Sequence, residues 1–357
     1  MLNYVIMAFC IIGAIDYVIG KKFGVGKEFE SGIMLLGSMA LSMVGMILLA
    51  PVIAELMVPV TALIDKYTPF DPSILSGMLL ANDMGGAPLS EAIATTELMG
   101  RFNGLVVGAT LGATISFTIP FALSVISKEY HSDVLMGILC GIGTVPVGCI
   151  VSGLMVGIPI VDLLIDMIPV VVFSVLVILG LLKFPSLSVR IFSWLGKIVI
   201  AIIIFGFVLG IMDRLLGIKL IKGMAPLDDG IDVIVNAACV MAGAFPLVHI
   251  LSKILSRPLS ALGKKIGLDD RSILGFLASG ASFATCTPLI PGMTKKGRIA
   301  NLAFAVSGAF TFAGHLAFTM SVDQSFVLPV VVGKLVSGIT AVAVALLIYK
   351  KLFGNQT

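Results

Sequence analysis

Nine apolar stretches of about 20 residues each constrain this chain more than any other feature. They lie near residues 2–19, 32–56, 102–126, 134–155, 160–182, 192–212, 231–252, 299–320 and 326–349. Each is long enough to cross the hydrocarbon core of a bilayer as an α-helix. Only 12% of the 357 residues are charged, against about 25% in a typical soluble domain. The sequence therefore predicts an all-α polytopic membrane protein, with residues 1–357 forming a single integral membrane domain.

Two shorter segments, 73–92 and 272–292, are interrupted by glycine, proline and polar residues. Neither suits a lipid-exposed helix, because a backbone that leaves the helix inside a bilayer must be surrounded by protein or by a water-filled cavity. We predict that each is a re-entrant hairpin, which enters the membrane and returns to the side from which it came.

The distribution of basic residues predicts the orientation. The first apolar stretch has no basic region before it and no small-residue cleavage site, and the lysines of segment 21–27 follow it, so it is predicted to be a membrane helix and not a signal peptide. Because loops rich in Lys and Arg stay in the cytoplasm, the N-terminus is predicted outside and the C-terminus, with Lys350 and Lys351, inside. The exceptions to this pattern are Lys66, Arg101 and the mixed stretch from Arg214 to Asp229.

The two predicted hairpins resemble each other in sequence, with matching residues in the same order at offsets of 197 to 200. The matches are Ser73-Ile74-Leu75 with Ser272-Ile273-Leu274, Pro88 with Pro288, and Gly100-Arg101 with Gly297-Arg298. An odd number of predicted spans separates the two copies, which would invert one relative to the other. We predict two inverted-topology repeats, approximately 31–155 and 231–349, an arrangement typical of transporters whose broken helices meet near the middle of the bilayer.

Asp83 is the strongest candidate for a binding residue. It lies in the stretch LLANDMGGAPLSEA of the first hairpin, and a carboxylate within a membrane is costly unless it is paired, hydrated or functional. Gly85 and Gly86 permit unusual backbone angles that leave carbonyl groups free, and Asn82 is a neighbouring hydrogen-bond partner. We predict a site for a small cation here; the alternative is that Asp83 caps a half-helix or pairs with a basic side chain.

The second hairpin offers hydroxyl groups instead of a charge. Ser282 and Thr285 lie at its predicted tip, where they would bind a substrate hydroxyl or a sodium ion, or satisfy the backbone of a broken helix. His315 lies in the middle of the stretch 299–320. It is predicted either to line the transport path and relay protons or to bond a neighbouring carbonyl.

Other ionisable residues lie nearer the ends of predicted spans, where placement at the membrane interface explains them. They are Asp16, Glu55, Asp162, Asp166 and His249. Glycines at positions 104, 108 and 112, and again at 137 and 141, form small-residue stripes. These stripes predict close packing between helices.

Several function classes are not indicated by the sequence. It has no HExxH, GxSxG or P-loop motif and no GxGxxG after a strand, so we expect no enzymatic activity and no catalytic residue. The five cysteines lie in apolar segments without a CxxC motif, which indicates neither a disulfide framework nor a metal site. No cofactor is indicated, and a net charge of +3 scattered through loops does not favour nucleic-acid binding.

The chain resembles the EutH family of bacterial ethanolamine-utilisation membrane proteins over nearly its whole length. The resemblance rests on ESGIMLLGSMALSMVGMILLAPVIA (30–54), LLANDMGG (79–86), GTVPVGCIVSGL (143–154), FAVSGAFTFAGHLAF (304–318) and VVGKLVSGITAVAV (331–344). It implies uptake of ethanolamine across the bacterial inner membrane, a link to cytosolic ethanolamine catabolism, and no enzymatic activity. The family motif DMGG matches Asp83 to Gly86. Asn82 stands where the family often has Cys, and Gly314 stands where a DH pair would place its acid.

Ethanolamine fits the predicted site chemically, because a primary amine with a pKa of about 10 is a cation at neutral pH. Asp83 would hold the ammonium group, and Asn82, Ser282 or Thr285 would hold the hydroxyl group. Three alternatives stay open: an ion-coupled carrier of another small amine, an intramembrane enzyme that would need a second carboxylate at similar depth, and a structural or sensory membrane protein. The sequence decides neither between facilitated diffusion and proton or sodium coupling nor whether the protein is a homo-oligomer.

Overall fold

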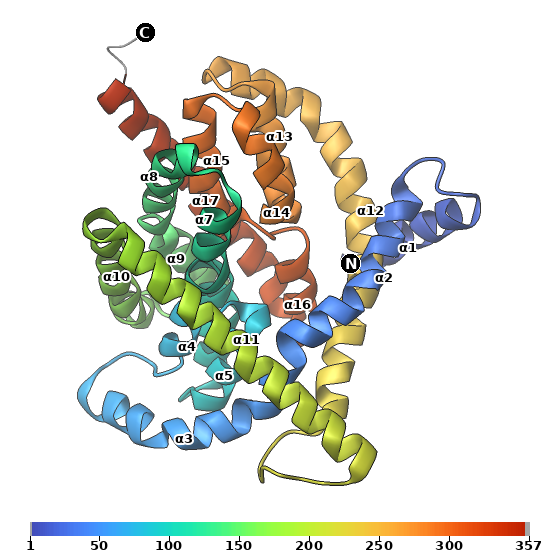
Figure 1. Cartoon of the computed structure of the whole chain (residues 1–357), viewed down its shortest axis with the longest axis vertical. Helices are drawn as coiled ribbons and strands as arrows, with labels where there is room; N and C mark the ends of the chain where they lie inside the picture. The colour runs from blue at the N-terminus through green and yellow to red at the C-terminus, as the bar shows by residue number, and fades with distance from the viewer. Residues whose placement is uncertain (1, 354–357) are drawn as a thin grey trace.

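A computed structural model describes residues 2–353, and that part of the chain is helical with no strand. The helices are α1 (Leu2–Val18), α2 (Val25–Met39), α3 (Gly45–Tyr67), α4 (Ile74–Leu79), α5 (Gly86–Ile93), α6 (Glu97–Arg101), α7 (Ile119–Val125), α8 (His131–Ile142), α9 (Val145–Met155), α10 (Ile160–Lys183), α11 (Pro185–Leu216), α12 (Leu227–Lys265), α13 (Asp270–Ala281), α14 (Phe283–Cys286), α15 (Lys295–Gly308), α16 (Gly314–Val322) and α17 (Val327–Phe353). Figure 1 shows their arrangement. The π-helical segments are η1 (Ala40–Val44), η3 (Phe102–Gly112) and η4 (Thr114–Thr118), and the 3₁₀ segments are η2 (Asn82–Met84), η5 (Lys128–Tyr130), η6 (Thr287–Gly292) and η7 (Gln324–Phe326).

Seven helical runs in the described part of the chain are long and apolar enough to cross a membrane. They overlap seven of the predicted spans, and the first predicted span forms the shorter helix α1. The prediction of an all-α polytopic membrane protein is confirmed. Many of the outward side chains of α10 and α11 are large, apolar and exposed, as expected for helices that face lipid.

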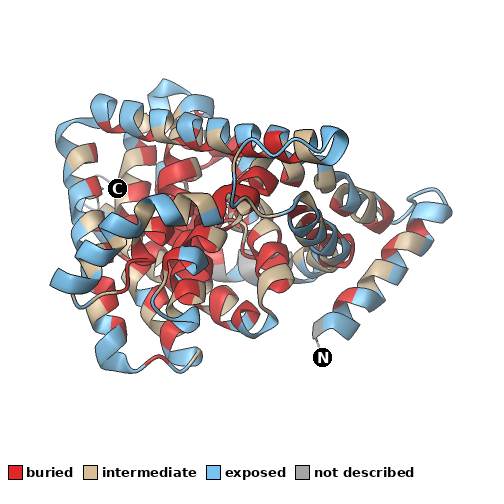
Figure 2. Cartoon of the chain, turned by 90° about the horizontal axis from the view of Figure 1, so that it is seen from below, coloured by how far each residue is buried: buried red, intermediate tan, exposed pale blue. Residues whose placement is uncertain are grey.

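The core surrounds one helical run, from α6 through η3 and η4 to α7, most of which is buried. Helices α8, α9, α15 and α17 pack together, whereas α1, α2 and α12 form a separate arm. Figure 2 shows the buried residues in the middle of the molecule and the exposed residues on the outer helices. The central run therefore serves as the support against which the shorter, broken segments pack.

The glycine stripe of this central run seats the first hairpin. A Cβ atom on Gly112 would lie 2.0 Å from the carbonyl oxygen of Leu80, and one on Gly108 would lie 3.2 Å from the backbone of Asn82. A side chain at either position would push the hairpin away from η3. The predicted close packing at Gly104, Gly108 and Gly112 is thus confirmed.

Both predicted hairpins are helix–break–helix units. In hairpin 1, α4 and α5 pack against each other across a break at residues 80–85; in hairpin 2, α13 packs against α14 and η6 across a break at Ser282. Breaks of this kind leave backbone groups that must find partners inside the protein. Re-entry of these hairpins into a membrane stays a prediction.

The predicted continuous span 299–320 is wrong, because the helix is interrupted between α15 and α16. Phe310 has a positive φ of 60°. Its amide donates to the carbonyl of Ser279 at 3.0 Å, and the amide of Phe312 donates to that of Gly280 at 2.9 Å. The backbone leaves the helix to bond the end of α13, a tertiary contact that hydropathy cannot reveal.

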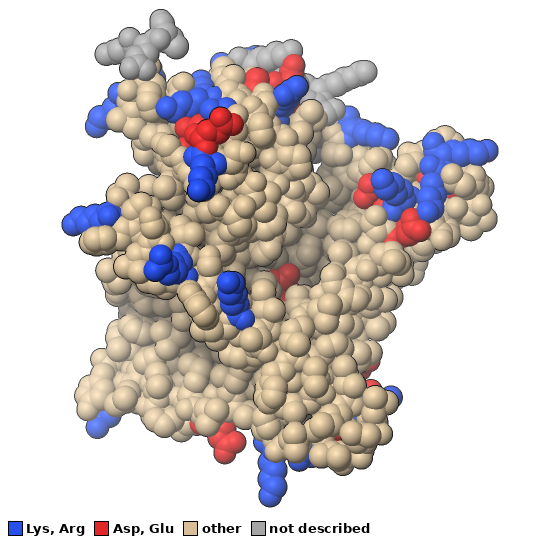
Figure 3. All heavy atoms as spheres, viewed as in Figure 1, with Lys and Arg blue, Asp and Glu red and all other residues tan. Residues whose placement is uncertain are grey.

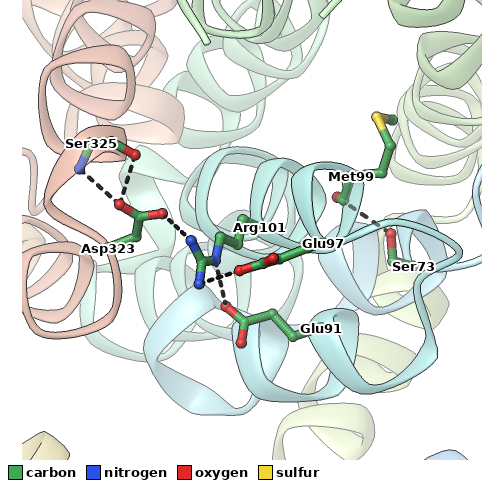
Figure 4. Close-up of polar contacts among 7 residues, drawn as sticks. All are labelled: Ser73, Glu91, Glu97, Met99, Arg101, Asp323 and Ser325. Atoms are coloured by element: carbon green, nitrogen blue, oxygen red, sulfur yellow. Dashed lines mark hydrogen bonds and ion pairs between the residues drawn. The ribbon is translucent and has the colours of Figure 1, made fainter.

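An ion pair joins the first half of the chain to the second. The guanidinium of Arg101 lies 2.6 Å from Asp323 and 2.6 Å from Glu97, and Figure 4 shows it between these carboxylates and that of Glu91. Partial burial alone would raise the pKa of Asp323, but hydrogen bonds from Ser325 and the charge of Arg101 outweigh it and lower that pKa. This contact pins the start of the central run to the loop before α17.

Candidate functional site

A cavity of about 350 Å³ lies where the tips of the two hairpins meet the break before α16. Asp83 lines it from hairpin 1, Ser282 from hairpin 2 and His315 from α16, while Phe117, Met241 and Phe310 contribute apolar wall. Figure 3 shows that this face of the molecule is hollowed beside the arm formed by α1, α2 and α12, and that most charged side chains lie away from the hollow. The cavity is large enough for a small organic molecule, and most of its lining is apolar.

The turn formed by η2 and Gly85 presents Asp83 to this cavity. The amides of Met84 and Gly86 both donate to the carbonyl of Ala81, at 3.0 and 2.8 Å, and Gly85 adopts a φ of 98° that favours glycine. A Cβ atom on Gly85 would also lie 2.1 Å from the side chain of Met46. The Asp83 side chain is 25% exposed, so its carboxylate reaches the cavity without being open to bulk solvent.

His315 lies between Asp83 and a buried lysine, Lys334. Its Nε2 lies 3.9 Å from Oδ1 of Asp83, which is too long for a direct hydrogen bond. On the other side of the ring, Nδ1 lies 3.0 Å from Nζ of Lys334. Lys334 is 1% exposed, and its Nζ also donates to the carbonyl of Ala109.

Lys334 is a residue that sequence reasoning missed. It lies in the middle of the predicted span 326–349, so the rule that singled out Asp83, an ionisable side chain within a membrane segment, applies equally to it. The structure adds what the sequence did not give: Lys334 and Asp83 lie on opposite sides of one imidazole ring. The site thus holds one carboxylate, one histidine and one lysine in a row.

The structure brings some of the predicted site residues into the cavity and leaves others outside. Ser282 lines it, whereas Thr285 lines a neighbouring cavity of about 670 Å³ together with Glu28 and His249. The Thr285 hydroxyl donates to the carbonyls of Ala278 and Ser282, at 2.9 and 2.7 Å, so it closes the tip of hairpin 2. Ser282 lines both cavities.

Asn82 lies behind the turn and does not line the cavity. It is fully buried, and neither atom of its amide group has a hydrogen-bond partner. Gly86 packs in the same turn, where a Cβ atom would lie 2.6 Å from the carbonyl oxygens of Leu80 and Ala81. Asn82, Gly85 and Gly86 therefore shape the position of Asp83.

The expectation that ionisable residues near span ends lie at the membrane interface is wrong for Asp166. It is 1% exposed and accepts a hydrogen bond from the amide of Asp71 at 3.1 Å. The reason is the fold: the start of α10 packs against hairpin 1, which covers the carboxylate with protein. Among the described residues, no cluster of three or more His, Cys, Asp or Glu side chains is arranged to hold a metal ion.

Comparison with known proteins shows similarity along almost the entire chain. The family described as "Ethanolamine utilisation protein, EutH" matches residues 1–348. The chain is 40% identical over 343 residues to the "Probable ethanolamine permease EutH" of Listeria monocytogenes, a match that covers 96% of this chain and 92% of that protein. It is 34% identical over 389 residues to the protein of the same name from Escherichia coli, covering 98% and 95% of the two chains.

A third relative, the "Uncharacterized protein YxeR" of Bacillus subtilis, is 35% identical over 342 residues, covering 96% of this chain and 92% of that protein. No solved structure matches this chain. The family match and these near-complete alignments agree with the resemblance carried by the DMGG motif at Asp83 to Gly86. The chain therefore belongs to the EutH family of ethanolamine utilisation proteins.

Proposed function

We propose that this protein transports ethanolamine across the bacterial inner membrane and that Asp83 binds the ammonium group of the substrate. The observation that carries the proposal is the placement of Asp83, a carboxylate facing a mostly apolar cavity between the two hairpin tips. Relatives named ethanolamine permease support the substrate, and the word permease points to transport instead of catalysis.

The cavity matches the charge of ethanolamine. At neutral pH the amine is a cation, and an ammonium group removed from water needs a carboxylate or several acceptors around it. Asp83 provides the carboxylate, and the apolar wall formed by Phe117, Met241 and Phe310 excludes competing water. A neutral alcohol of the same size would leave Asp83 without its counter-ion, which favours the amine.

The hydroxyl group of the substrate is assigned to His315 and Ser282. As an ammonium, Lys334 has only donors, so it donates both to Nδ1 of His315 and to the carbonyl of Ala109. The imidazole proton then stays on Nε2, which faces Asp83. In this arrangement Nε2–H donates to the substrate oxygen, while the neighbouring carboxylate of Asp83 accepts from the substrate nitrogen.

The membrane orientation follows the sequence prediction. We propose an outside N-terminus and a cytoplasmic C-terminus, so that ethanolamine is delivered to cytosolic catabolism. The inverted-repeat architecture, approximately residues 31–155 and 231–349, belongs to the same proposal. Its support is that hairpins 1 and 2 approach one cavity from the two halves of the chain.

Uptake of labelled ethanolamine into proteoliposomes tests the role of Asp83. In Asp83→Asn we expect the initial rate to fall at least about thirtyfold, because a desolvated ammonium loses its only charged partner. The matched control is Asp229→Asn, which removes an exposed carboxylate at the start of α12 and should leave the rate unchanged. Normal uptake by well-folded Asp83→Asn protein would remove Asp83 from the site.

A further inference from the structure

A second group of acidic residues lies at the base of hairpin 1, away from the Asp83 cavity. Asp71 is buried, and four donors satisfy its carboxylate. Oδ1 accepts from the amide and hydroxyl of Ser73, at 2.9 and 2.6 Å, and Oδ2 accepts from the amide of Thr95 at 3.1 Å and from its hydroxyl. The negative charge of Asp71 is thus accommodated by hydrogen bonds from the hairpin itself.

Asp166, beside Asp71, is not satisfied in this way. Its Oδ1 accepts from the amide of Asp71 at 3.1 Å, but its Oδ2 is buried and has no hydrogen-bond partner. No ion pair to Asp166 exists within residues 2–353. A buried carboxylate without a basic partner is normally neutralised or coordinated to a cation.

Asn103 has a second buried side-chain oxygen without a hydrogen-bond partner. Its side chain also interacts with the carboxyl group of Asp166. Asn103 is fully buried. Its Nδ2 donates to the hydroxyl of Ser73 at 3.0 Å, which leaves Oδ1 buried and without a partner. Oδ2 of Asp166 and Oδ1 of Asn103 therefore lie in the same buried region, and apart from the interaction between these two side chains neither oxygen has a hydrogen-bond partner.

A cavity gives access to this region. A cavity of about 500 Å³ is lined by Asp71 and Asp166 and, nearer its rim, by Asp65 and Asp162. Both rim acids are exposed. Their charges would raise the local concentration of cations at the entrance.

We propose that Asp166 and Asn103 form a binding site for a small monovalent cation, and that Na⁺ is its ligand. Carboxylate and amide oxygens are hard ligands that suit cations of this type. Asp71 is already satisfied by four donors, so the ionised form of Asp166 would supply one negative charge to match one positive charge. An ammonium group shares this charge, and the experiments below separate the two ligands.

A cation bound at this site can also affect the substrate cavity, because both lie on hairpin 1 or contact it. Asn103 bonds Ser73 at the start of hairpin 1, and the tip of the same hairpin carries Asp83. A cation that binds one position of this hairpin more tightly biases the equilibrium between positions. Cation binding stands independently of the proposed function; only its coupling to ethanolamine uptake rests on that function.

Thermal unfolding of the detergent-purified protein tests the site without any amine. We expect NaCl, but not KCl or N-methylglucamine chloride at equal ionic strength, to raise Tm by several degrees and to saturate. Asp166→Asn should abolish this rise, whereas Asp229→Asn, which changes an exposed carboxylate outside this cavity, should keep it. Asn103→Ala is the second variant, expected to weaken Na⁺ binding at least about fivefold.

The proposal is overturned if the wild-type protein shows no Na⁺-specific rise, or if the rise survives in Asp166→Asn. Ethanolamine hydrochloride is then tested on Asp83→Asn protein. If it raises Tm there and loses that effect when Asp166→Asn is added, the ligand is an ammonium group and the assignment to Na⁺ is wrong. Failure of the proposed function would be seen separately, because Na⁺-dependent stabilisation would persist in a wild-type protein that did not transport ethanolamine.

Discussion

The two hairpins have matching bases and different tips. At each base an aspartate accepts hydrogen bonds from the amide and hydroxyl of a serine at the start of the first helix and of a threonine that precedes the next long helix. The residues are Asp71, Ser73 and Thr95 in hairpin 1 and Asp269, Ser272 and Thr294 in hairpin 2. At the tips, Asp83 faces Ser282 across one cavity. The similar bases fix the backbone at the start and end of each hairpin. The tips differ in chemistry, because one presents a carboxylate and the other a hydroxyl group.

The bases differ in their surroundings. Asp71 is buried beside Asp166, whereas Asp269 is only partly buried. The helical runs that follow also carry reciprocal ion pairs near their starts: Arg101 bonds Asp323 of the second half at 2.6 Å, and Arg298 bonds Asp133 of the first half at 2.8 Å. This exchange of partners supports the proposal of two inverted repeats. Because the solvent exposure of Asp71 and Asp269 differs, we expect these equivalent residues to contribute unequally to the free energy of unfolding.

The largest expected effect comes from removing the two basal carboxylates. Asp71→Asn should destabilise the protein by about 3 kcal/mol, because buried amide and hydroxyl donors lose a charged acceptor. Asp269→Asn should cost about 1 kcal/mol, since water replaces the lost acceptor at a partly exposed site. Thermal unfolding of the purified variants measures both.

Equal falls in Tm for Asp71→Asn and Asp269→Asn would contradict the ranking by burial. Asp229→Asn, which changes an exposed carboxylate outside both hairpins, is the control for loss of charge alone. Its Tm should stay at the wild-type value.

Substrate selectivity tests the role of the hydroxyl group at the tip of hairpin 2. Ser282→Ala should reduce the preference for ethanolamine over ethylamine about tenfold, because a site built to bond a hydroxyl loses one partner. Thr285→Ala is the matched control: its hydroxyl donates to backbone carbonyls and lines the neighbouring cavity, so the preference should not change. Competition between the two amines for uptake gives the ratio. If both variants lose selectivity equally, the hydroxyl is recognised elsewhere.

Much of the fold, and one part of the site, could be predicted from the sequence. Long apolar stretches and the broken segments around Asp83 and Ser282 follow from hydropathy and from residues that interrupt helices. The interruption before His315 could not be predicted, because it depends on amides that bond the end of α13. Lys334 carried the same signal as Asp83, but its partner became visible only when α16 and α17 were placed side by side.

The burial of Asp166 could not be predicted either. Its position near the end of a span is compatible with the membrane interface, and only the packing of α10 against hairpin 1 removes it from water. Short-range patterns thus identify which residues are unusual. Their roles depend on contacts between segments far apart in the chain.

The smallest expected effect is a pH dependence at the base of hairpin 2. Partial burial alone would raise the pKa of the Asp269 carboxyl, but hydrogen bonds from Ser272 and Thr294 outweigh it and lower the pKa from 3.8 to about 2. A lowered folded-state pKa means that the carboxylate stabilises the fold fully above about pH 4 and loses this contribution as the pH falls towards 2. Because the group is partly exposed, solvent screening limits the contribution to about 1 kcal/mol or less. The difference in Tm between wild type and Asp269→Asn should therefore be constant from pH 6 to pH 4 and narrow below it; a difference that stays constant down to pH 2 would show that these hydrogen bonds do not depend on the charge of Asp269.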